Sequence, residues 1–299
     1  MLTYALSVAS LGGRLTDGLI AALGRHPPSH GGAWDLEVLP ADWQPGGEDP
    51  DRLNDYLRLV GAGVIRVGSI HLPFGGAWDF SVADETARRA AVARQLDVID
   101  QCAPLGATQL TLHASAEPVD PAERRTRLGQ ALRSIEELLP AARRHGLRLA
   151  IEWLPRSCIG NQEEELFALV APFPAPEVGI LLDVNHVMAR HAELPSIIGT
   201  LAPRLVALHL SDYNGIDECH WVPGDSEGVI DWHSVMSAIR ALVRDVRLIV
   251  ETRRTLVQGD PVGMLKRLDT SLAFLRGLGA RTTFRTSAAG TARAPCPEF

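Results

Sequence analysis

Short runs of apolar and β-branched residues alternate with longer amphipathic segments along most of this chain. There are eight such runs. Most are too continuously apolar to leave one face in water, which is typical of strands buried on both sides. The predicted strands cover residues 3–8, 34–39, 64–72, 109–113, 148–152, 178–183, 205–210 and 247–251.

The segments between these runs repeat their apolar residues at helical spacing. The strongest pattern predicts a helix with Asp120 as its N-cap, Pro121 at its first position and Gly146 just past its end. Similar or weaker patterns predict helices over residues 15–23, 51–59, 86–102, 163–170, 186–201, 232–243 and 261–275.

Strands that alternate with helices predict parallel βαβ units, and right-handed crossovers favour their closure into a (β/α)8 TIM barrel of the α/β class. The alternative is an open doubly wound sheet, but no G-x-G-x-x-G follows the first predicted strand. A barrel takes up about 250 residues as one domain. We therefore expect one domain over residues 1–278. The tail over 279–299 has a composition that predicts flexibility.

Composition narrows the classes of protein that this chain can belong to. With 46% apolar residues among 299, it can bury a large core, and it has no apolar run long enough to span a membrane. No signal peptide is evident, so we expect a cytoplasmic protein. A net charge of −7 provides no broad basic surface, which disfavours nucleic acid as a partner without excluding it. The four cysteines have no C-x-x-C spacing, so histidines and carboxylates would have to hold any metal.

Six of the predicted strands carry a histidine or a carboxylate at or next to their last residue. In a barrel these ends meet at the face where active sites lie. Taken alone, each group could be a hydrogen-bonded core histidine or half of an ion pair. Together they predict a shared divalent cation (Mn²⁺, Zn²⁺, Co²⁺ or Mg²⁺), because burying several unpaired carboxylates is costly. The residues are His71, His113, Glu152, Asp183, His209 and Glu251.

Other candidates flank these strand ends. His186 follows the sixth strand, and Glu218 and His220 follow the seventh in a glycine-containing segment that can approach the same cation. That segment can equally be a rigid cover with its histidine in solvent. Trp153, Trp221 and Phe74 can wall the apolar side of a sugar pocket or simply belong to the packing.

The pattern Glu152…Asp183-x-x-His186…His209…Glu251, with a P-G-x-x-E-G-x-I-D segment after the seventh strand, resembles the xylose isomerase-like barrel superfamily. The resemblance extends from about residue 2 to residue 278. The superfamily includes sugar isomerases and epimerases, inosose dehydratase and the endonuclease IV family.

Resemblance to the epimerase branch implies that Glu152, Asp183, His209 and Glu251 coordinate one divalent ion. It also implies that the two glutamates exchange protons with the carbon beside a substrate carbonyl, through an enediolate. His186 matches a substrate-contacting position. The arginine usual in the loop after strand seven is absent, since residue 215 is Gly. The further substrate-binding candidates are His71, His113, His220, Trp153 and Arg253.

Resemblance to the endonuclease branch implies three zinc ions. His71 and His113 match extra ligands of one ion, and His186 and His220 match ligands of another. Glu218 stands where that family has an aspartate. Basic residues that could grip DNA, such as Arg156, Arg190, Arg253 and Arg254, are sparse. The Arg253-Arg254 pair could instead bind a sugar phosphate or carboxylate.

We therefore expect a metal-dependent isomerase or epimerase of a small sugar or sugar-like polyol or keto compound, with a homodimer as a possible assembly. The alternatives are a zinc-dependent, endonuclease IV-like abasic-site phosphodiesterase, a cyclitol dehydratase, and a barrel that binds a metal or sugar without turnover.

Overall fold

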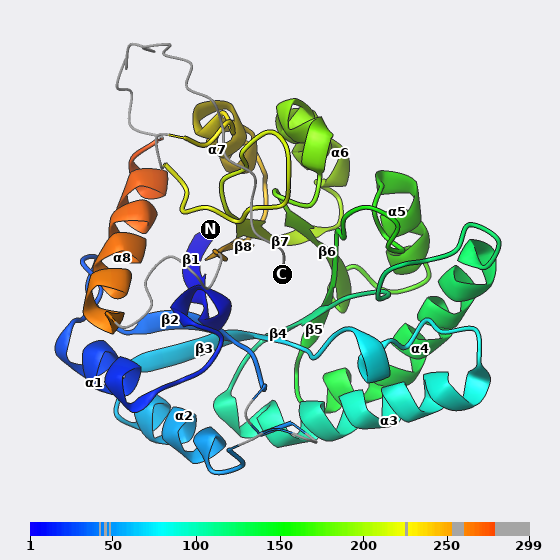
Figure 1. Ribbon diagram of the computed structural model, residues 1–299, viewed down its shortest axis with the longest axis horizontal. Helices are drawn as coiled ribbons and strands as arrows, with labels where there is room; N and C mark the ends of the chain where they lie inside the picture. The colour runs from blue at the N-terminus through cyan, green and yellow to red at the C-terminus, as the bar shows by residue number, and fades with distance from the viewer. Residues whose placement is uncertain (42, 45–46, 48, 225–226, 253–259, 279–299) are drawn as a thin grey trace.

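The computed structural model is a closed barrel of eight parallel strands, paired in the order β1 to β8, with helices around the outside (Figure 1). This confirms the predicted (β/α)8 barrel. The structure describes residues 1–41, 43–44, 47, 49–224, 227–252 and 260–278. The predicted tail over 279–299 lies outside the described residues, and the predicted domain boundary stays a prediction.

Each predicted strand run forms a strand of the barrel. His113 and Glu251, predicted as strand ends, lie one residue beyond their strands. The strands are β1 (Leu2–Ser7), β2 (Trp34–Val38), β3 (Ile65–His71), β4 (Gln109–Leu112), β5 (Arg148–Glu152), β6 (Val178–Asp183), β7 (Leu205–Leu210) and β8 (Val246–Val250).

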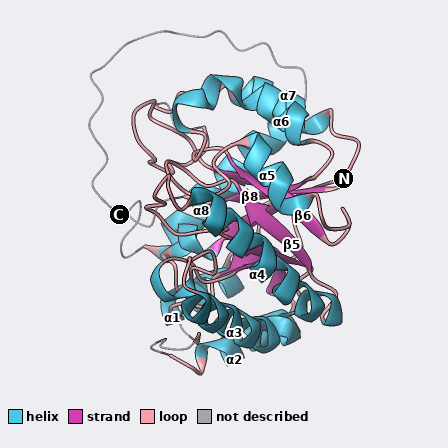
Figure 2. Ribbon diagram, turned by 90° about the vertical axis from the view of Figure 1, so that its right-hand side faces the viewer, coloured by secondary structure: helices cyan, strands magenta, loops and turns pink. Residues whose placement is uncertain are grey.

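Eight α-helices of the described residues surround the strands (Figure 2). Several begin at a side chain that accepts a hydrogen bond from a first-turn amide, as Asp84 does from Ala87 at 2.7 Å. No helix in the described part of the chain is both long and apolar enough to cross a membrane. The helices are α1 (Asp17–Arg25), α2 (Arg52–Gly61), α3 (Glu85–Cys102), α4 (Arg124–Arg144), α5 (Glu163–Val170), α6 (Leu194–Leu201), α7 (Trp232–Arg240) and α8 (Pro261–Gly277).

Two predicted helix starts are wrong. Helix α4 begins at Arg124 rather than after Asp120, whose carboxylate accepts from the Ala122 amide at 2.8 Å within a turn. Such a local side-chain bond competes with helix formation. The helix predicted over 186–201 is a turn followed by a 3-10 helix, Met188–Glu193, and only then α6. Met188 has a φ of 52°, which interrupts the continuous α-helix predicted here.

The barrel interior is layered along its axis. A small apolar cluster, separate from the larger core, contains Ala5, Ala150, Leu181, Val206, Ala207 and Ile249. Since alternate residues of a strand face the same side, Ala150 shares its face with Arg148 at the amino end of β5 and Glu152 at the carboxyl end. Polar side chains therefore occupy both ends of the barrel, with apolar side chains between them.

Candidate functional site

The predicted strand-end residues converge at the carboxyl end of the barrel, together with His186 and His220. They form three groups, and the potential ligand atoms within each group lie within 4.8 Å of one another. Glu152 and Asp183 each belong to two groups. We name them the His71 group (His71, His113, Glu152), the central group (Glu152, Asp183, His209, Glu251) and the His186 group (Asp183, His186, His220).

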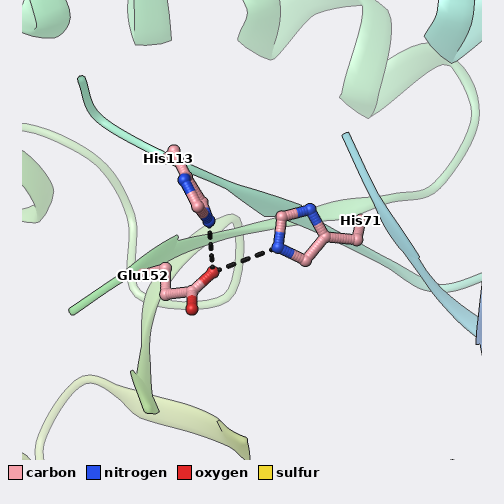
Figure 3. Close-up of side chains that lie close together, drawn as sticks. All are labelled: His71, His113 and Glu152. Carbon is pink, nitrogen blue, oxygen red and sulfur yellow. Dashed lines mark ion pairs between the residues drawn. The ribbon is translucent and has the colours of Figure 1, made fainter. Parts of the chain in front are cut away.

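In the His71 group, two imidazoles from neighbouring strands point at one carboxylate oxygen (Figure 3). Glu152 Oε2 lies 3.2 Å from His71 Nε2 and 3.1 Å from His113 Nε2. The other ring nitrogen of His71, Nδ1, lies 2.9 Å from the carbonyl oxygen of Leu72. A carbonyl can only accept, so Nδ1 carries the proton, and in the neutral ring Nε2 presents a lone pair to Glu152.

In the central group, His209 Nδ1 faces three carboxylates. It lies 3.2 Å from Glu152 Oε1, 2.8 Å from Glu251 Oε2 and 3.7 Å from Asp183 Oδ2. His209, Glu152 and Asp183 are almost completely buried, whereas the Glu251 side chain is 15% exposed. Glu251 is therefore the carboxylate of this group that is most accessible from outside.

Glu37 on β2 also belongs to the site, although its place in the sequence did not single it out. It is fully buried, and its Oε1 lies 2.8 Å from His209 Nε2. Its Oε2 accepts a hydrogen bond from Thr111 Oγ1 at 2.8 Å. A carboxylate behind a ligating histidine fixes the tautomer and the ring orientation. The available signal was a charged residue inside a run predicted to be buried on both faces.

The His186 group is built in the same way. His186 Nδ1 lies 2.8 Å from the Trp153 carbonyl oxygen, so Nε2 faces the carboxylates, at 3.7 Å from Asp183 Oδ2 and 3.4 Å from Glu218 Oε1. His220 Nε2 lies 3.3 Å from the same oxygen of Glu218. The predicted proximity of Glu218, His220 and His186 is thus present in the structure.

This arrangement fits a divalent cation. Glu152 Oε2 and Asp183 Oδ2 are buried carboxylate oxygens that have no hydrogen-bond partner within the described part of the chain, although each faces imidazole nitrogens. An imidazole lone pair and a carboxylate oxygen repel each other unless a proton or a metal ion lies between them. Nitrogen and oxygen donors in this combination suit Zn²⁺, Mn²⁺ or Co²⁺.

The electrostatics of the site also favour positive charge. Burial lowers the pKa of His71, but close contact with the negatively charged Glu152 carboxylate outweighs burial and raises the pKa to about 9. In the same way, Asp183 and Glu218 outweigh burial and raise the pKa of His186 to about 10. For Glu152, burial is outweighed by His209 and His113, which hold its pKa well below the usual range. A site that retains protons this strongly in the metal-free protein also attracts metal cations.

The aromatic and arginine candidates from the sequence differ in exposure and in contacts. Trp153 is almost fully buried, with the Arg190 guanidinium 5.6 Å from its ring, and its role in a sugar pocket stays a prediction. Phe74 is 51% exposed and stacks on His113 with ring centroids 4.1 Å apart. Trp221 is half-buried. Arg253 and Arg254 lie outside the described residues.

The two other arginines considered for DNA contact are engaged in ion pairs. Arg156 pairs with Glu117 and Glu218. Arg190 pairs with Glu163 at 2.8 Å and with Glu193 at 3.0 Å.

Comparison with solved structures finds the same fold in sugar epimerases. A D-tagatose 3-epimerase-like protein is 19% identical, with 93% of this chain and 100% of that one covered and a TM-score of 0.70. D-psicose 3-epimerase from Clostridium cellulolyticum H10, solved with D-tagatose, is 16% identical over 92% and 99% of the two chains, with a TM-score of 0.73. The IOLI protein with a bound zinc atom is 18% identical over 92% and 98%, with a TM-score of 0.70.

The family comparison is more direct. The model of the family described as xylose isomerase-like TIM barrel matches residues 36–278. That span includes Glu37, the three groups and all the strands from β3 to β8. The chain therefore belongs to the xylose isomerase-like TIM barrel family.

Proposed function

We propose that the protein is a divalent-metal-dependent isomerase or epimerase of a small sugar or sugar-like polyol or keto compound. The observation that carries the proposal is the central group, in which Glu152 and Glu251 both approach His209 Nδ1 beside Asp183. Two carboxylates around one centre suit epimerisation, in which one takes a proton from the carbon next to the carbonyl and the other returns a proton to that carbon from the opposite side. The fold shared with sugar epimerases adds support.

In this proposal Glu152, Asp183, His209 and Glu251 would hold the cation. When bound, it would supply Lewis acidity to the carbonyl and hydroxyl oxygens of the substrate and so acidify the neighbouring C–H bond. Glu251, the more accessible carboxylate, takes the proton from the substrate carbon. Ser7 Oγ donates to its Oε1 at 3.2 Å and orients it.

Glu152 is the second proton-transfer group of the proposal. It is 1% exposed, with one oxygen toward His71 and His113 and the other toward His209. These contacts fix the direction of its carboxylate, and the proton that it returns to the substrate comes from a neighbouring imidazolium such as His71. His71, His113, His186 and His220 are then available to contact substrate hydroxyl oxygens. The walls of the pocket would include Trp153 and, by our sequence prediction, Arg253.

The proposal is tested by exchange of solvent deuterium into candidate ketoses by the purified, metal-loaded protein. Wild type is expected to label the carbon beside the carbonyl. Glu251→Gln and Glu152→Gln are expected to lower the exchange rate by at least about a thousandfold while keeping the circular dichroism spectrum, since each removes a proton-transfer group. Full exchange activity in either variant would contradict the assigned role.

A second candidate function, an endonuclease IV-like phosphodiesterase, is favoured by a specific observation. The His71 and His186 groups add two further clusters of potential ligands to the central group, and Glu152 and Asp183 are shared between clusters. Such sharing suits several ions close together, as in metal-assisted phosphodiester hydrolysis. Metal analysis separates the candidates: one ion per chain supports the isomerase, and three zinc ions with cleavage of an abasic oligonucleotide support the phosphodiesterase.

A cyclitol dehydratase would use the same proton abstraction and would be identified by loss of water from the product. Cytoplasmic location and assembly as a homodimer stay predictions from the sequence.

A further inference from the structure

The opposite end of the barrel contains a cavity of about 530 Å³. It is lined by residues at or next to the amino ends of the strands, including Thr3, Gln109, Arg148, Val206 and Arg247. Arg148 and Glu152 are the first and last residues of β5, four positions or roughly 13 Å apart along the strand. The apolar layer around Ala150 lies between them, so this cavity is separate from the metal-binding groups.

One glycine, Gly68, keeps this end of the barrel open to a polar side chain. A Cβ atom at Gly68 would lie only 1.8 Å from Arg247 Nη1. That space allows the Arg247 guanidinium to reach Asp35 at 2.7 Å. The interior of a TIM barrel is ordinarily filled by branched apolar side chains. Here arginine, glutamine and threonine side chains line a hollow instead.

One arginine of this cavity, Arg148, has no carboxylate partner among the residues that the structure describes. Arg247 is paired with Asp35, and Arg143 is paired with Glu177 at 2.6 Å. Arg148 is half-buried, and its Nε donates to the Pro176 carbonyl at 2.8 Å. Among the described residues, no carboxylate lies within 4.0 Å of Arg148, and its two terminal nitrogens have no acceptor.

The surroundings of Arg148 add positive charge. Burial, followed by the positive charge of Arg244, lowers the pKa of Arg148. Arg244 donates to the Leu205 carbonyl and has no carboxylate within 4.0 Å in the part of the chain that the structure describes. The lining also contains Glu177 and Asp245, but the first is paired with Arg143 and the second with the N-terminal amine.

A second polar side chain lies beside this arginine. Gln109 is 5% exposed and lines the cavity, and its amide nitrogen Nε2, which neighbouring atoms cover, has no hydrogen-bond partner among the described residues. In the parallel pairing of β4 with β5, Gln109 is the residue opposite Arg148. A buried donor with no acceptor is destabilising, so a ligand that supplies an acceptor is favoured here.

We propose that this cavity binds a small oxyanion of the phosphate class through Arg148 and Gln109. The planar guanidinium offers paired donors to phosphate oxygens, and the Gln109 amide offers one more once its side chain turns toward the ligand. The cavity is several times larger than a phosphate group, so a small phosphorylated metabolite fits as well as free phosphate. The site does not depend on the proposed isomerase activity.

The test is titration of the full-length, metal-loaded protein with inorganic phosphate and with glycerol 3-phosphate, followed by calorimetry. Arg148→Gln is expected to lower the affinity for the anion at least tenfold, and Gln109→Leu to lower it severalfold. The matched control is Arg66→Gln, at the same barrel end, because Arg66 pairs with Asp35 but does not line the cavity. It is expected to change the affinity less than twofold.

A different variant shows whether phosphate binds instead at the metal-binding end of the barrel. Such binding would be weakened by Glu251→Gln and unaffected by Arg148→Gln, and that result would overturn the proposal. Equal affinity of wild type and Arg148→Gln would also overturn it. If Arg148→Gln fails to fold, Arg148→Lys keeps the charge but loses the planar fork and is expected to bind several times more weakly than wild type. Tighter binding of glycerol 3-phosphate than of phosphate would identify a phosphorylated metabolite as the ligand, and the reverse order would identify free phosphate.

Discussion

At the scale of single residues, Glu37 determines how His209 can act. Because the Glu37 carboxylate accepts from Nε2, the lone pair of His209 is on Nδ1, toward Glu152 and Glu251. Glu37→Gln replaces this acceptor with a neutral amide, which lowers the basicity of the imidazole and can reverse its tautomer. We expect metal affinity to fall about 10- to 100-fold, measured by titration with Zn²⁺ or Mn²⁺ against a fluorescent chelator.

Thr111→Val is the control for that variant. Thr111 donates to Glu37 Oε2, the oxygen that does not contact His209, so its loss is expected to reduce the affinity less than Glu37→Gln does. Unchanged metal affinity in Glu37→Gln, with the fold intact, would show that Glu37 does not control the histidine.

Arg156 acts on the His186 group through Glu218. It adopts a φ of 49°, unusual for a residue with a side chain, and pairs with one oxygen of Glu218 while the other oxygen faces His186 and His220. Arg156→Gln is expected to weaken binding of an ion at this group severalfold, because Glu218 loses the contact that orients its carboxylate, and a partly exposed ion pair contributes about 1 kcal/mol or less.

The measurement is the number of ions per chain retained after dialysis at defined free metal concentration. Arg190→Gln is the control, because the partners of Arg190 are Glu163 and Glu193, outside all three groups. An equal loss of ions in both variants would indicate a general effect on the fold instead.

At the scale of elements, Asp212 anchors the segment between β7 and α7 that carries Glu218 and His220. Its Oδ2 accepts from Trp232 Nε1 at 2.8 Å, and its Oδ1 accepts from the amides of Tyr213 and Ile230. A Cβ at Gly228 would lie about 2.0 Å from the Asp212 carboxyl carbon. Gly228→Ala is therefore expected to lower the free energy of unfolding by about 1–3 kcal/mol.

Urea denaturation checks this prediction. Gly129→Ala serves as the matched substitution, since Gly129 lies inside α4 and a Cβ there meets nothing within 4 Å. It is expected to raise the free energy of unfolding by about 0.5–1 kcal/mol, the usual difference between alanine and glycine in a helix. If both substitutions shift stability in the same direction, the close approach to Asp212 is not what constrains residue 228.

The elements also show which features the sequence could predict. Buried parallel strands leave a local signal, a continuous apolar run, and a polar residue at the end of such a run is visible without the fold. Glu37 left a weaker signal because its partner, His209, is 172 positions away. The turn at Met188 and the late start of α4 were not predictable from spacing, because local backbone geometry and a side-chain bond at Asp120 decided them.

At the scale of the whole molecule, charge is distributed between the two ends of the barrel. Carboxylates and imidazoles gather at the carboxyl ends of the strands, and arginines gather at the amino ends. The apolar layer around Ala150 lies between the two polar ends and separates them. A cation at one end and an anion at the other would each be bound where the protein offers the opposite charge.

The carboxylate-rich end predicts how stability depends on pH. In the metal-free protein, the pKa of His71 is about 9 and that of His186 about 10, against an ordinary value of 6.5. Raised pKa values in the folded state give stability that is fully present below pH 6.5 and is lost as pH rises through 9 to 10. We expect the free energy of unfolding to fall by a few kcal/mol over that range.

The metal-loaded protein is the comparison that isolates this effect. In the metal-loaded protein, bound cations occupy the place of the protons on these histidines. The free energy of unfolding of that form is therefore expected to change less between pH 6.5 and 10. Groups far from the site titrate alike in the metal-loaded and the metal-free protein. Urea denaturation of the two forms at each pH measures the difference, and His71→Asn should reduce the slope of the metal-free protein. Parallel curves for the two forms would mean that these histidines do not exchange protons for metal, and the three groups would then be a network of ion pairs.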